Sequence, residues 1–281
     1  MINKISWLKK RDLNAHKNDF GHVAVLAGSR NMPGAGVLVA NTAMKCGSGL
    51  VTKFQISSSN ALCIPEVMYC FLEDGGAGCF TSEMAPQIIA SLARATVLVV
   101  GPGLGNEKTT AECVYKVLGA SNIPTVIDAS ALNYLSENQE LKLPKETILT
   151  PHYGEGARLL HCSVAEIEND KLKSAEEISK KYHSVVVLKG AETIVCDARG
   201  EETEYFNLNN PNPYLATAGS GDVLAGIISA CLAQGLPPFE AAKLAVYAHN
   251  MAGVKAHAIK KSFIVASDII DYCDLEGDSC K

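Results

Sequence analysis

The fold class follows from one stretch of the chain, Thr96-Val97-Leu98-Val99-Val100-Gly101-Pro102-Gly103-Leu104-Gly105. Its first half is a continuous apolar run rich in β-branched residues, which is typical of a strand buried on both faces. Strands of this kind belong to parallel sheets that are covered by helices. Its second half places three glycines at the carboxyl end of the strand, where open α/β sheets bind ligands.

Similar apolar runs occur on both sides of this stretch and alternate with segments of helical periodicity. The predicted strands comprise residues 22–27, 50–54, 96–100, 124–128, 147–150 and 184–190, and the predicted helices comprise residues 36–47, 84–95, 111–118, 163–182 and 240–259. We expect the helical stretch 163–182 to comprise two segments, the first capped by Ser163 with Glu166 and the second formed by residues 175–182, and we expect Ser267 with Asp268 to open a short final helix. Residues 193–196 follow the last strand so closely that a hairpin is expected, and the sheet is then mixed.

The composition indicates one domain over residues 1–281, because 47% of the residues are hydrophobic and can form a large core. A net charge of −5 argues against a nucleic-acid-binding surface. No apolar run has membrane-spanning length, and residues 1–7 lack a signal-peptide pattern. We therefore expect a cytoplasmic protein that binds neither nucleic acid nor membrane.

The ten cysteines are scattered along the chain, lack Cys-x-x-Cys spacing and often occupy apolar positions. We expect them to be free thiols that serve as small buried hydrophobes, and we predict no zinc site.

A second informative stretch is residues 217–226, in which Gly219 and Gly221 precede a helix that ends near Gly235. The first N–H groups of a helix lack partners, and glycines let a phosphate approach them, so this segment is suited to anions. Asp222 lies within it. Its carboxylate is either a helix-start acid stabilised by the dipole or a general base beside a bound phosphate.

Two common nucleotide motifs are absent from the sequence. The glycines of residues 101–105 are spaced G-x-G-x-G rather than G-x-G-x-x-G, and no G-x-x-x-x-G-K-[ST] occurs. A nucleotide would therefore be held by the helix start at Gly219–Asp222 rather than by a Rossmann turn or a P-loop.

Taken together, the motifs resemble those of ADP- or ATP-dependent NAD(P)H-hydrate dehydratases, a branch of the ribokinase-like superfamily. In chain order they are His16-Lys17, Phe20-Gly21-His22, Gly28-Ser29, Gly34-Ala35, Gly47-Ser48-Gly49-Leu50-Val51, Gly101–Gly105, Asp128 with Ala131-Leu132-Asn133, Thr150-Pro151-His152 with Gly154-Glu155, Val187-Leu188-Lys189-Gly190, and 216–226. The resemblance implies a three-layer α/β sandwich with a mostly parallel central sheet and helices on both faces.

The resemblance also implies a role for individual residues, with Asp222 as the catalytic acid-base residue. Contacts to the hydrated nicotinamide substrate would come from Ala35, Gly103, His152 and Asp222, and contacts to the nucleotide from Lys189, Gly190, Ala191, Glu192, Thr193, Gly219, Ser220 and Gly221. Taken singly, several of these residues have plainer explanations: a helix-start alanine at 35, a satisfied loop histidine at 152 and a solvated strand-end charge at 189.

The implied reaction restores NADH or NADPH from a hydrate whose reduced ring carries a hydroxyl group. Phosphorylation of that hydroxyl by ADP or ATP makes phosphate the leaving group, and its elimination regenerates the dihydropyridine. Mg²⁺ is implied by phosphoryl transfer, although the sequence shows no set of metal ligands. The segment 189–193 is compatible with either phosphate donor.

The sequence departs from the family pattern at Ser130, where an acid is usual, in the loop around Met32-Pro33 and in the loop 209–214. We expect any NAD(P)H-hydrate epimerase to be a separate protein. Two alternatives stay open: a ribokinase-like kinase of a vitamin precursor, and a non-catalytic nucleotide-binding protein with this fold. Assembly into a homo-oligomer is also open, since apolar faces such as 241–252 suit either the core or a subunit interface.

Overall fold

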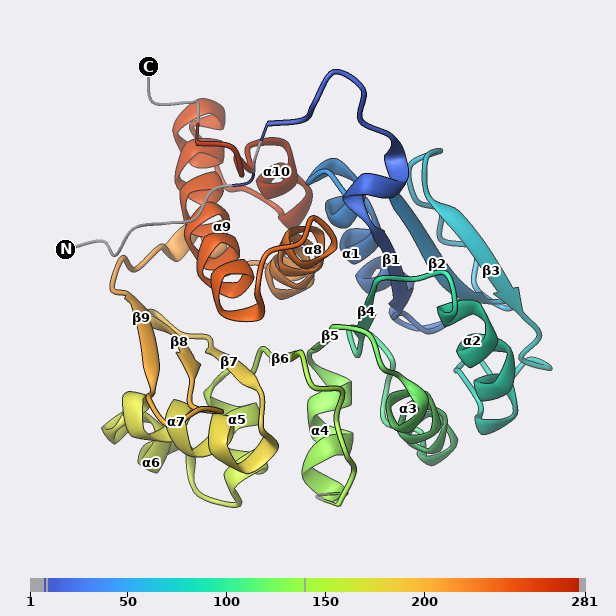
Figure 1. The fold of residues 1–281 in the computed structure, drawn as a ribbon, viewed down its shortest axis with the longest axis horizontal. Coiled ribbons are helices and arrows are strands. Elements are labelled where there is room, and N and C mark those ends of the chain that lie inside the picture. Colours follow the sequence, from blue (N-terminus) through green and yellow to red (C-terminus); the bar gives the residue numbers. More distant parts are fainter. Residues whose placement is uncertain (1–7, 9, 139, 278–281) are drawn as a thin grey trace.

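The centre of the molecule is one nine-stranded sheet, seen in a computed structural model that describes residues 8, 10–138 and 140–277 (Figure 1). The strands are β1 (His22–Leu26), β2 (Leu50–Ile56), β3 (Met68–Leu72), β4 (Val97–Val100), β5 (Thr125–Ile127), β6 (Thr147–Leu149), β7 (Val185–Leu188), β8 (Thr193–Asp197) and β9 (Glu204–Leu208). Their order is β3-β2-β1-β4-β5-β6-β7-β8-β9. All neighbours from β3 to β7 are parallel, whereas β8 and β9 pair antiparallel. The predicted mixed sheet with a hairpin at residue 193 is confirmed.

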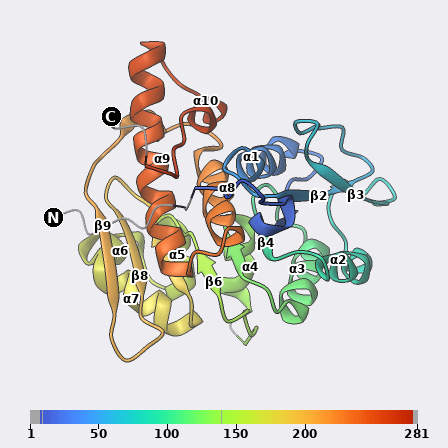
Figure 2. The ribbon, with the colours of Figure 1, turned by 45° about the horizontal axis from the view of Figure 1, so that its top comes forward.

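Helices cover both faces of the sheet and complete a three-layer sandwich (Figures 1 and 2). One face carries α1 (Pro33–Lys45), α8 (Ser220–Ala233), α9 (Pro238–Lys260) and α10 (Ala266–Asp271); the other carries α2 (Ala85–Leu92), α3 (Lys108–Ala120), α4 (Ser130–Glu137), α5 (Tyr153–Leu160), α6 (Val164–Asn169) and α7 (Lys171–Tyr182). Short 3-10 turns are η1 (Lys17–Phe20), η2 (Ser82–Met84) and η3 (Pro213–Leu215). The predicted fold class is therefore confirmed.

The apolar run of β4 shows why a doubly covered strand lacks alternation. Val97 and Val99 belong to the core under α1, α8 and α9, whereas Leu98 and Val100 belong to the core under the other helices. All four side chains are fully buried. Successive side chains of a strand point to opposite faces, so two apolar faces require an unbroken apolar sequence.

Two strands, β3 and β9, and two α-helices, α4 and α5, were not predicted. β3 is an edge strand with Met68 and Phe71 exposed, so its sequence shows no alternation. The short helices α4 and α5 begin almost directly after strands, and β9 (Glu204–Leu208) lies in a segment for which the sequence predicts no strand.

The cap of the final helix is a correction. α10 begins after Val265 rather than at Ser267, and Asp268 Oδ2 accepts a hydrogen bond from the Val265 N–H at 2.9 Å. The cap predicted at Ser163 is confirmed, because Ser163 Oγ accepts from the Glu166 N–H and Glu166 Oε2 accepts from the Ser163 N–H.

The nine cysteines within the described residues are free, and five of them are buried, as the sequence predicts. The apolar face of α9 between residues 241 and 252 also packs in the core, because Ala241, Leu244, Ala248 and Ala252 are buried. None of the described helices has the length and apolarity needed to cross a membrane.

The sheet changes its direction of winding between β1 and β4, because β2 lies on one side of β1 and β4 on the other. The carboxyl ends of these strands are held together: the Gly101 N–H donates to Leu26 O at 3.2 Å and the Gly28 N–H to Pro102 O at 2.7 Å. Such a switch point opens a crevice in which α/β proteins bind ligands.

The close packing of α8 on α1 depends on Gly226. A Cβ at this position would lie 2.6 Å from Thr42 Cβ and 2.8 Å from Val39 O, closer than packed atoms allow. Gly226→Ala should therefore lower the free energy of unfolding by about 2 kcal/mol, even though alanine favours helices. Urea unfolding measures the change. Gly119→Ala in α3 is the matched control, since the nearest atom there is 4.0 Å away and a small gain is expected. Equal midpoints for the two variants would contradict this contact.

Candidate active site

The first component of the site is the amino end of α8. Gly219 precedes the helix with a φ of 85°, a left-handed conformation that favours glycine. A Cβ there would also lie 2.3 Å from Leu38 Cδ1, so the Leu38 side chain would have to move. Among the described residues, no backbone acceptor is taken by the N–H groups of Gly221 and Asp222. These groups, with the positive end of the helix dipole, form an anion-binding helix start.

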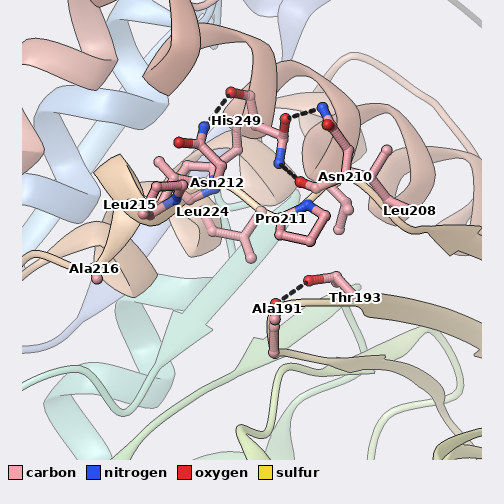
Figure 3. Close-up of a pocket in the computed structure, with 14 residues that line it drawn as sticks. Ala191, Thr193, Leu208, Asn210, Pro211, Asn212, Leu215, Ala216, Leu224 and His249 are labelled. Carbon is pink, nitrogen blue, oxygen red and sulfur yellow. Dashed lines mark hydrogen bonds between the residues drawn. The ribbon is translucent and has the colours of Figure 1, made fainter. Parts of the chain in front are cut away.

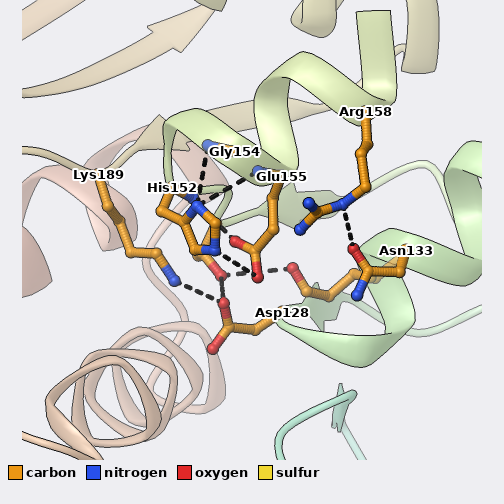
Figure 4. Close-up of polar contacts among 9 residues, drawn as sticks. Asp128, Asn133, His152, Gly154, Glu155, Arg158 and Lys189 are labelled. Carbon is orange, nitrogen blue, oxygen red and sulfur yellow. Dashed lines mark hydrogen bonds and ion pairs between the residues drawn. The ribbon is translucent and has the colours of Figure 1, made fainter. Parts of the chain in front are cut away.

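The second component is a buried ion pair across three strand ends. Asp128 follows β5 and is 1% exposed; its Oδ1 accepts hydrogen bonds from Thr150 Oγ1 and Lys189 Nζ, both at 2.7 Å. Figure 4 shows Lys189 and Asp128 pointing toward each other. Burial by itself would lower the pKa of Lys189, but the charges of Asp128, Glu155 and Asp222 raise it. Lys189 is therefore an ammonium ion at neutral pH.

The third component is Asp222, in the first turn of α8. Burial and the nearby Asp128 carboxylate raise the pKa of Asp222 to about 7, against the opposing charge of Lys189. Gly221 lies against the ion pair, since a Cβ there would be 3.5 Å from Lys189 Nζ and 3.9 Å from Asp128 Oδ2. A carboxyl group that titrates near neutral pH beside an anion site is suited to general base catalysis.

His152 has a structural role that the sequence left open. It is the N-cap of α5, and its Nδ1 accepts hydrogen bonds from the N–H groups of Gly154 at 3.0 Å and Glu155 at 3.2 Å. Because Nδ1 is an acceptor, the proton of the neutral ring is on Nε2. Nε2 lies 3.4 Å from Glu155 Oε1, and Glu155 Oε2 accepts from the His152 N–H at 2.8 Å. The imidazole thus caps the helix through Nδ1 and has its N–H donor at Nε2.

These components surround one cavity of about 540 Å³. Its lining includes seven of the predicted site residues, namely His152, Lys189, Gly190, Thr193, Ser220, Gly221 and Asp222, together with Asp128, Glu155 and His249. The structure therefore brings together residues from the ends of β5, β6 and β7 and from the start of α8.

A second cavity of about 630 Å³ adjoins the first and is shown in Figure 3. Both cavities are lined by Gly190, Thr193, Leu215, Leu224 and His249, and Ala191 lines the second alone. The remaining walls of the second cavity are largely apolar apart from amide side chains. Asn210 and Asn250 form two mutual hydrogen bonds of 2.9 Å there. Such an apolar cavity with few polar groups is typical of small-molecule sites.

His249 is a site residue that sequence reasoning missed. It lies on α9 and is 7% exposed, and its Nε2 is 3.2 Å from Ser220 Oγ. Burial lowers the pKa of His249 to about 4, so the ring is neutral at physiological pH. The sequence offered no signal for it, because its spacing within a long helix is the same as that of a core residue.

Four predicted residues lie outside these cavities, one of which is Gly219, the residue that precedes α8. Ala35 and Gly103 meet at the switch point, where a Cβ on Gly103 would be 2.7 Å from Ala35 Cβ. Glu192 instead pairs with Lys171 Nζ at 3.0 Å and accepts from Asn207 Nδ2, so its carboxylate is engaged in the turn between β7 and β8. Within the described part of the chain, no cluster of three or more His, Cys, Asp or Glu side chains could hold a metal ion.

Comparison with known proteins places this site in context. Residues 23–274 match the family model described as NAD(P)H-hydrate dehydratase. The bifunctional NAD(P)H-hydrate repair enzyme Nnr of Moorella thermoacetica is 36% identical over 273 residues, which cover 95% of this chain and 51% of that protein. The chain thus spans about half the length of the bifunctional relatives that it matches.

Shorter relatives match over most of their length. The ADP-dependent (S)-NAD(P)H-hydrate dehydratase of Neisseria meningitidis is 35% identical over 271 residues, covering 93% of this chain and 85% of that protein. Among solved structures, the ADP/ATP-dependent NAD(P)H-hydrate dehydratase of Bacillus subtilis, co-crystallised with ATP/Mg²⁺, has a TM-score of 0.76 and 27% identity, with 95% of this chain and 92% of that chain covered.

Proposed function

Because this chain belongs to the NAD(P)H-hydrate dehydratase family, we propose that it converts (6S)-hydrated NADH and NADPH back to NADH and NADPH with ADP or ATP as phosphoryl donor. The proposal is supported above all by Asp222, whose pKa is raised to about 7 at the start of an anion-binding helix. A base that ionises near neutral pH, next to a phosphate site, is what transfer of a phosphoryl group to a hydroxyl requires.

The residues of the cavity divide the chemistry between them. Asp222 takes the proton of the ring hydroxyl while the hydroxyl oxygen attacks the terminal phosphorus of the nucleotide. The N–H groups of Gly221 and Asp222, with the ammonium of Lys189, stabilise the charge that spreads over the phosphoryl oxygens. Loss of the resulting phosphate and of one ring proton restores the dihydropyridine. The products are NAD(P)H, phosphate and a nucleotide shorter by one phosphate.

We assign the two ligands to two different places beside the cavity that contains Asp222. We assign the nucleoside to the second cavity, because its apolar walls, neutral His249 and amide side chains suit a base and a ribose. We assign the nicotinamide ring to the switch point at Ala35 and Gly103, with the Nε2–H of His152 as a donor. Glu192 then contributes by shaping the turn at 189–193 rather than by direct contact.

The residues present fit a magnesium ion that is carried by the nucleotide phosphates. Mg²⁺ in such sites takes one or two carboxylates and fills its other positions with phosphate oxygens and water. Asp128 and Asp222 both line the cavity, and hydrogen bonds from Thr150 and Lys189 engage only Oδ1 of Asp128. When bound, the ion would neutralise phosphate charge.

We also propose that an NAD(P)H-hydrate epimerase supplies the (6S) substrate, and that this repair takes place in the cytoplasm. The free thiols of the described residues are consistent with a reducing compartment.

The decisive experiment follows the near-ultraviolet absorbance of reduced nicotinamide during incubation of hydrated NADH with the protein, Mg²⁺ and either ADP or ATP. Nucleotide-dependent recovery of NADH is expected, and comparison of the two nucleotides identifies the donor. Absence of recovery from folded protein that binds nucleotide would refute the proposal. Formation of a stable phosphate ester from a vitamin precursor would then identify a ribokinase-like kinase instead.

The pH dependence of the reaction should depend on Asp128. Since the ionised form of Asp222 is the base, kcat/KM should rise as the pH increases through about 7. The Asp128 carboxylate raises the pKa of Asp222, so Asp128→Asn should move this limb of the profile to lower pH, by about one unit. A limb that stays in place or moves to higher pH would show that another group is titrating.

A further inference from the structure

Arg158 occupies a position beside the proposed site that the mechanism does not use. It lies on α5, one turn beyond Glu155, and its Nε donates a hydrogen bond of 2.8 Å to Asn133 Oδ1 on α4. Figure 4 shows its guanidinium group on the same side of α5 as His152 and Glu155. Both Arg158 and His152 are exposed to solvent.

Gly154 brings this cation close to the imidazole of His152. A Cβ on Gly154 would lie 2.9 Å from His152 Cε1 and 3.9 Å from Arg158 Nη1. The two side chains thus lie on either side of the space next to Gly154. His152 is the residue to which we assign a contact with the nicotinamide ring. A group bound next to the ring on the outer side of His152 therefore meets the guanidinium.

The charge of Arg158 has no counter-ion in the described part of the chain. Only its Nε is engaged, and the partner, Asn133, is neutral. The nearest acid along the helix, Glu155, accepts from the His152 N–H and lies 3.4 Å from His152 Nε2. The two terminal nitrogens of the guanidinium, four N–H donors in a planar fork, are thus oriented but left for an anion.

The hydrated dinucleotide carries an anionic group one ribose away from its nicotinamide ring. Its nicotinamide ribose is followed by a pyrophosphate, which NADH and NADPH hydrates share. Lys189 and the start of α8 are already occupied by the phosphates of the donor nucleotide in the proposed mechanism. Arg158 lies on the other side of His152 from Lys189 (Figure 4), away from the place assigned to the donor phosphates.

Resting on the proposed function, we propose that Arg158 binds the pyrophosphate of the hydrated dinucleotide, with Asn133 as the residue that positions its guanidinium. Arginine recognises phosphate through two parallel hydrogen bonds, which lysine cannot reproduce. The plainer explanation is that Arg158 only links α5 to α4 through Asn133. That role would affect stability and would act on all substrates alike.

The test measures steady-state kinetics of Arg158→Gln and Arg158→Lys with hydrated NADH at saturating nucleotide. Loss of a charge-assisted contact should raise the KM for hydrated NADH about ten- to a hundredfold, with kcat and the KM for the nucleotide changed less than about twofold. Asn133→Ala should raise the same KM by a smaller factor. Arg94→Gln, at an exposed site beyond α2 on the opposite edge of the sheet, is the control for the loss of one positive charge.

A substrate without phosphate separates binding from structure. With hydrated reduced nicotinamide riboside, the wild type and Arg158→Gln should have equal kcat/KM values, because the group that Arg158 binds is missing. An equal loss on both substrates would overturn the proposal in favour of a structural role. An effect confined to hydrated NADPH would overturn it in favour of contact with the 2′-phosphate.

Failure of the inference is distinguishable from failure of the proposed function. If the wild type does not act on hydrated NADH, the function itself is wrong and the inference falls with it. If the wild type acts and Arg158→Gln acts with an unchanged KM, only the inference is wrong. Binding of NADH, followed by its fluorescence, is a measurement that does not depend on turnover. The Kd for NADH should rise in Arg158→Gln by the same factor as the KM for hydrated NADH.

Discussion

Asp222→Asn is expected to lower kcat for hydrated NADH about a thousandfold while leaving nucleotide binding nearly unchanged. The amide keeps the size and the hydrogen-bonding reach of the carboxyl group but cannot accept the hydroxyl proton. Single-turnover kinetics with the donor identified in the wild type measure the loss, and equilibrium titration with the same nucleotide measures its Kd. Asp271→Asn, at an exposed ion pair with Lys45, serves as the control. If the Asp222→Asn enzyme kept its activity, Asp222 would not be the catalytic base.

The same substitution should make the protein more stable, and the sign follows from the pKa. Burial and Asp128 raise the pKa of Asp222 from 3.8 to about 7, so the folded protein favours the protonated form. The contribution of this raised pKa to the free energy of unfolding is fully present below pH 4 and is lost as the pH rises through 7. Asp222→Asn should therefore gain about 1–2 kcal/mol at pH 8, a figure discounted for partial exposure, and little at pH 4. Thermal unfolding at both pH values tests the difference.

Lys189→Met should weaken both the fold and the reaction. It leaves Asp128, which is 1% exposed, as a buried carboxylate with only Thr150 as donor, so the free energy of unfolding should fall by about 2–3 kcal/mol. It also removes a cation from the phosphoryl site, and kcat/KM should fall at least about a hundredfold. Because Lys189 holds the pKa of Asp222 down, the rising limb of the pH profile should move to higher pH.

The control for Lys189→Met is Lys173→Met, which breaks an exposed ion pair with Glu177 at 3.7 Å. Exposed pairs contribute about 0–1 kcal/mol, so this variant should unfold and react much as the wild type does. If Lys189→Met matched it in stability, the buried pair with Asp128 would not be formed. If it matched in kcat/KM alone, Lys189 would be a structural residue.

The sequence predicted the elements whose environment leaves a simple pattern. Strands such as β4 are buried on both faces and have continuous apolar runs, so they were found. β3 was missed because it lies at the edge of the sheet, with Met68 and Phe71 exposed. α5 was missed because it is short and its cap is a histidine, whose role as a backbone acceptor depends on the fold.

The candidate site was predictable where local backbone chemistry identifies it. Gly219, Gly221 and Asp222 are adjacent in the chain, and glycines before a helix indicate an anion site without knowledge of the fold. The pair of Asp128 with Lys189 spans 61 positions, and His249 reaches Ser220 across 29. Such contacts depend on strand order and helix packing, which motifs in one sequence do not contain.

The residues of the proposed site, the winding switch between β1 and β4 included, also divide along the chain according to the ligand that they contact. Residues at the switch point come from the first 105 positions, whereas Lys189, Asp222 and the second cavity come from positions after 188. Apart from Asp222, which both ligands share, the residues assigned to the acceptor thus lie before position 159, His152 and Arg158 included, and those assigned to the donor lie after position 188. Mutational libraries confined to the acceptor residues among the first 158 positions should change which alcohol is accepted and leave donor preference intact, which makes this architecture well suited to the engineering of new acceptors.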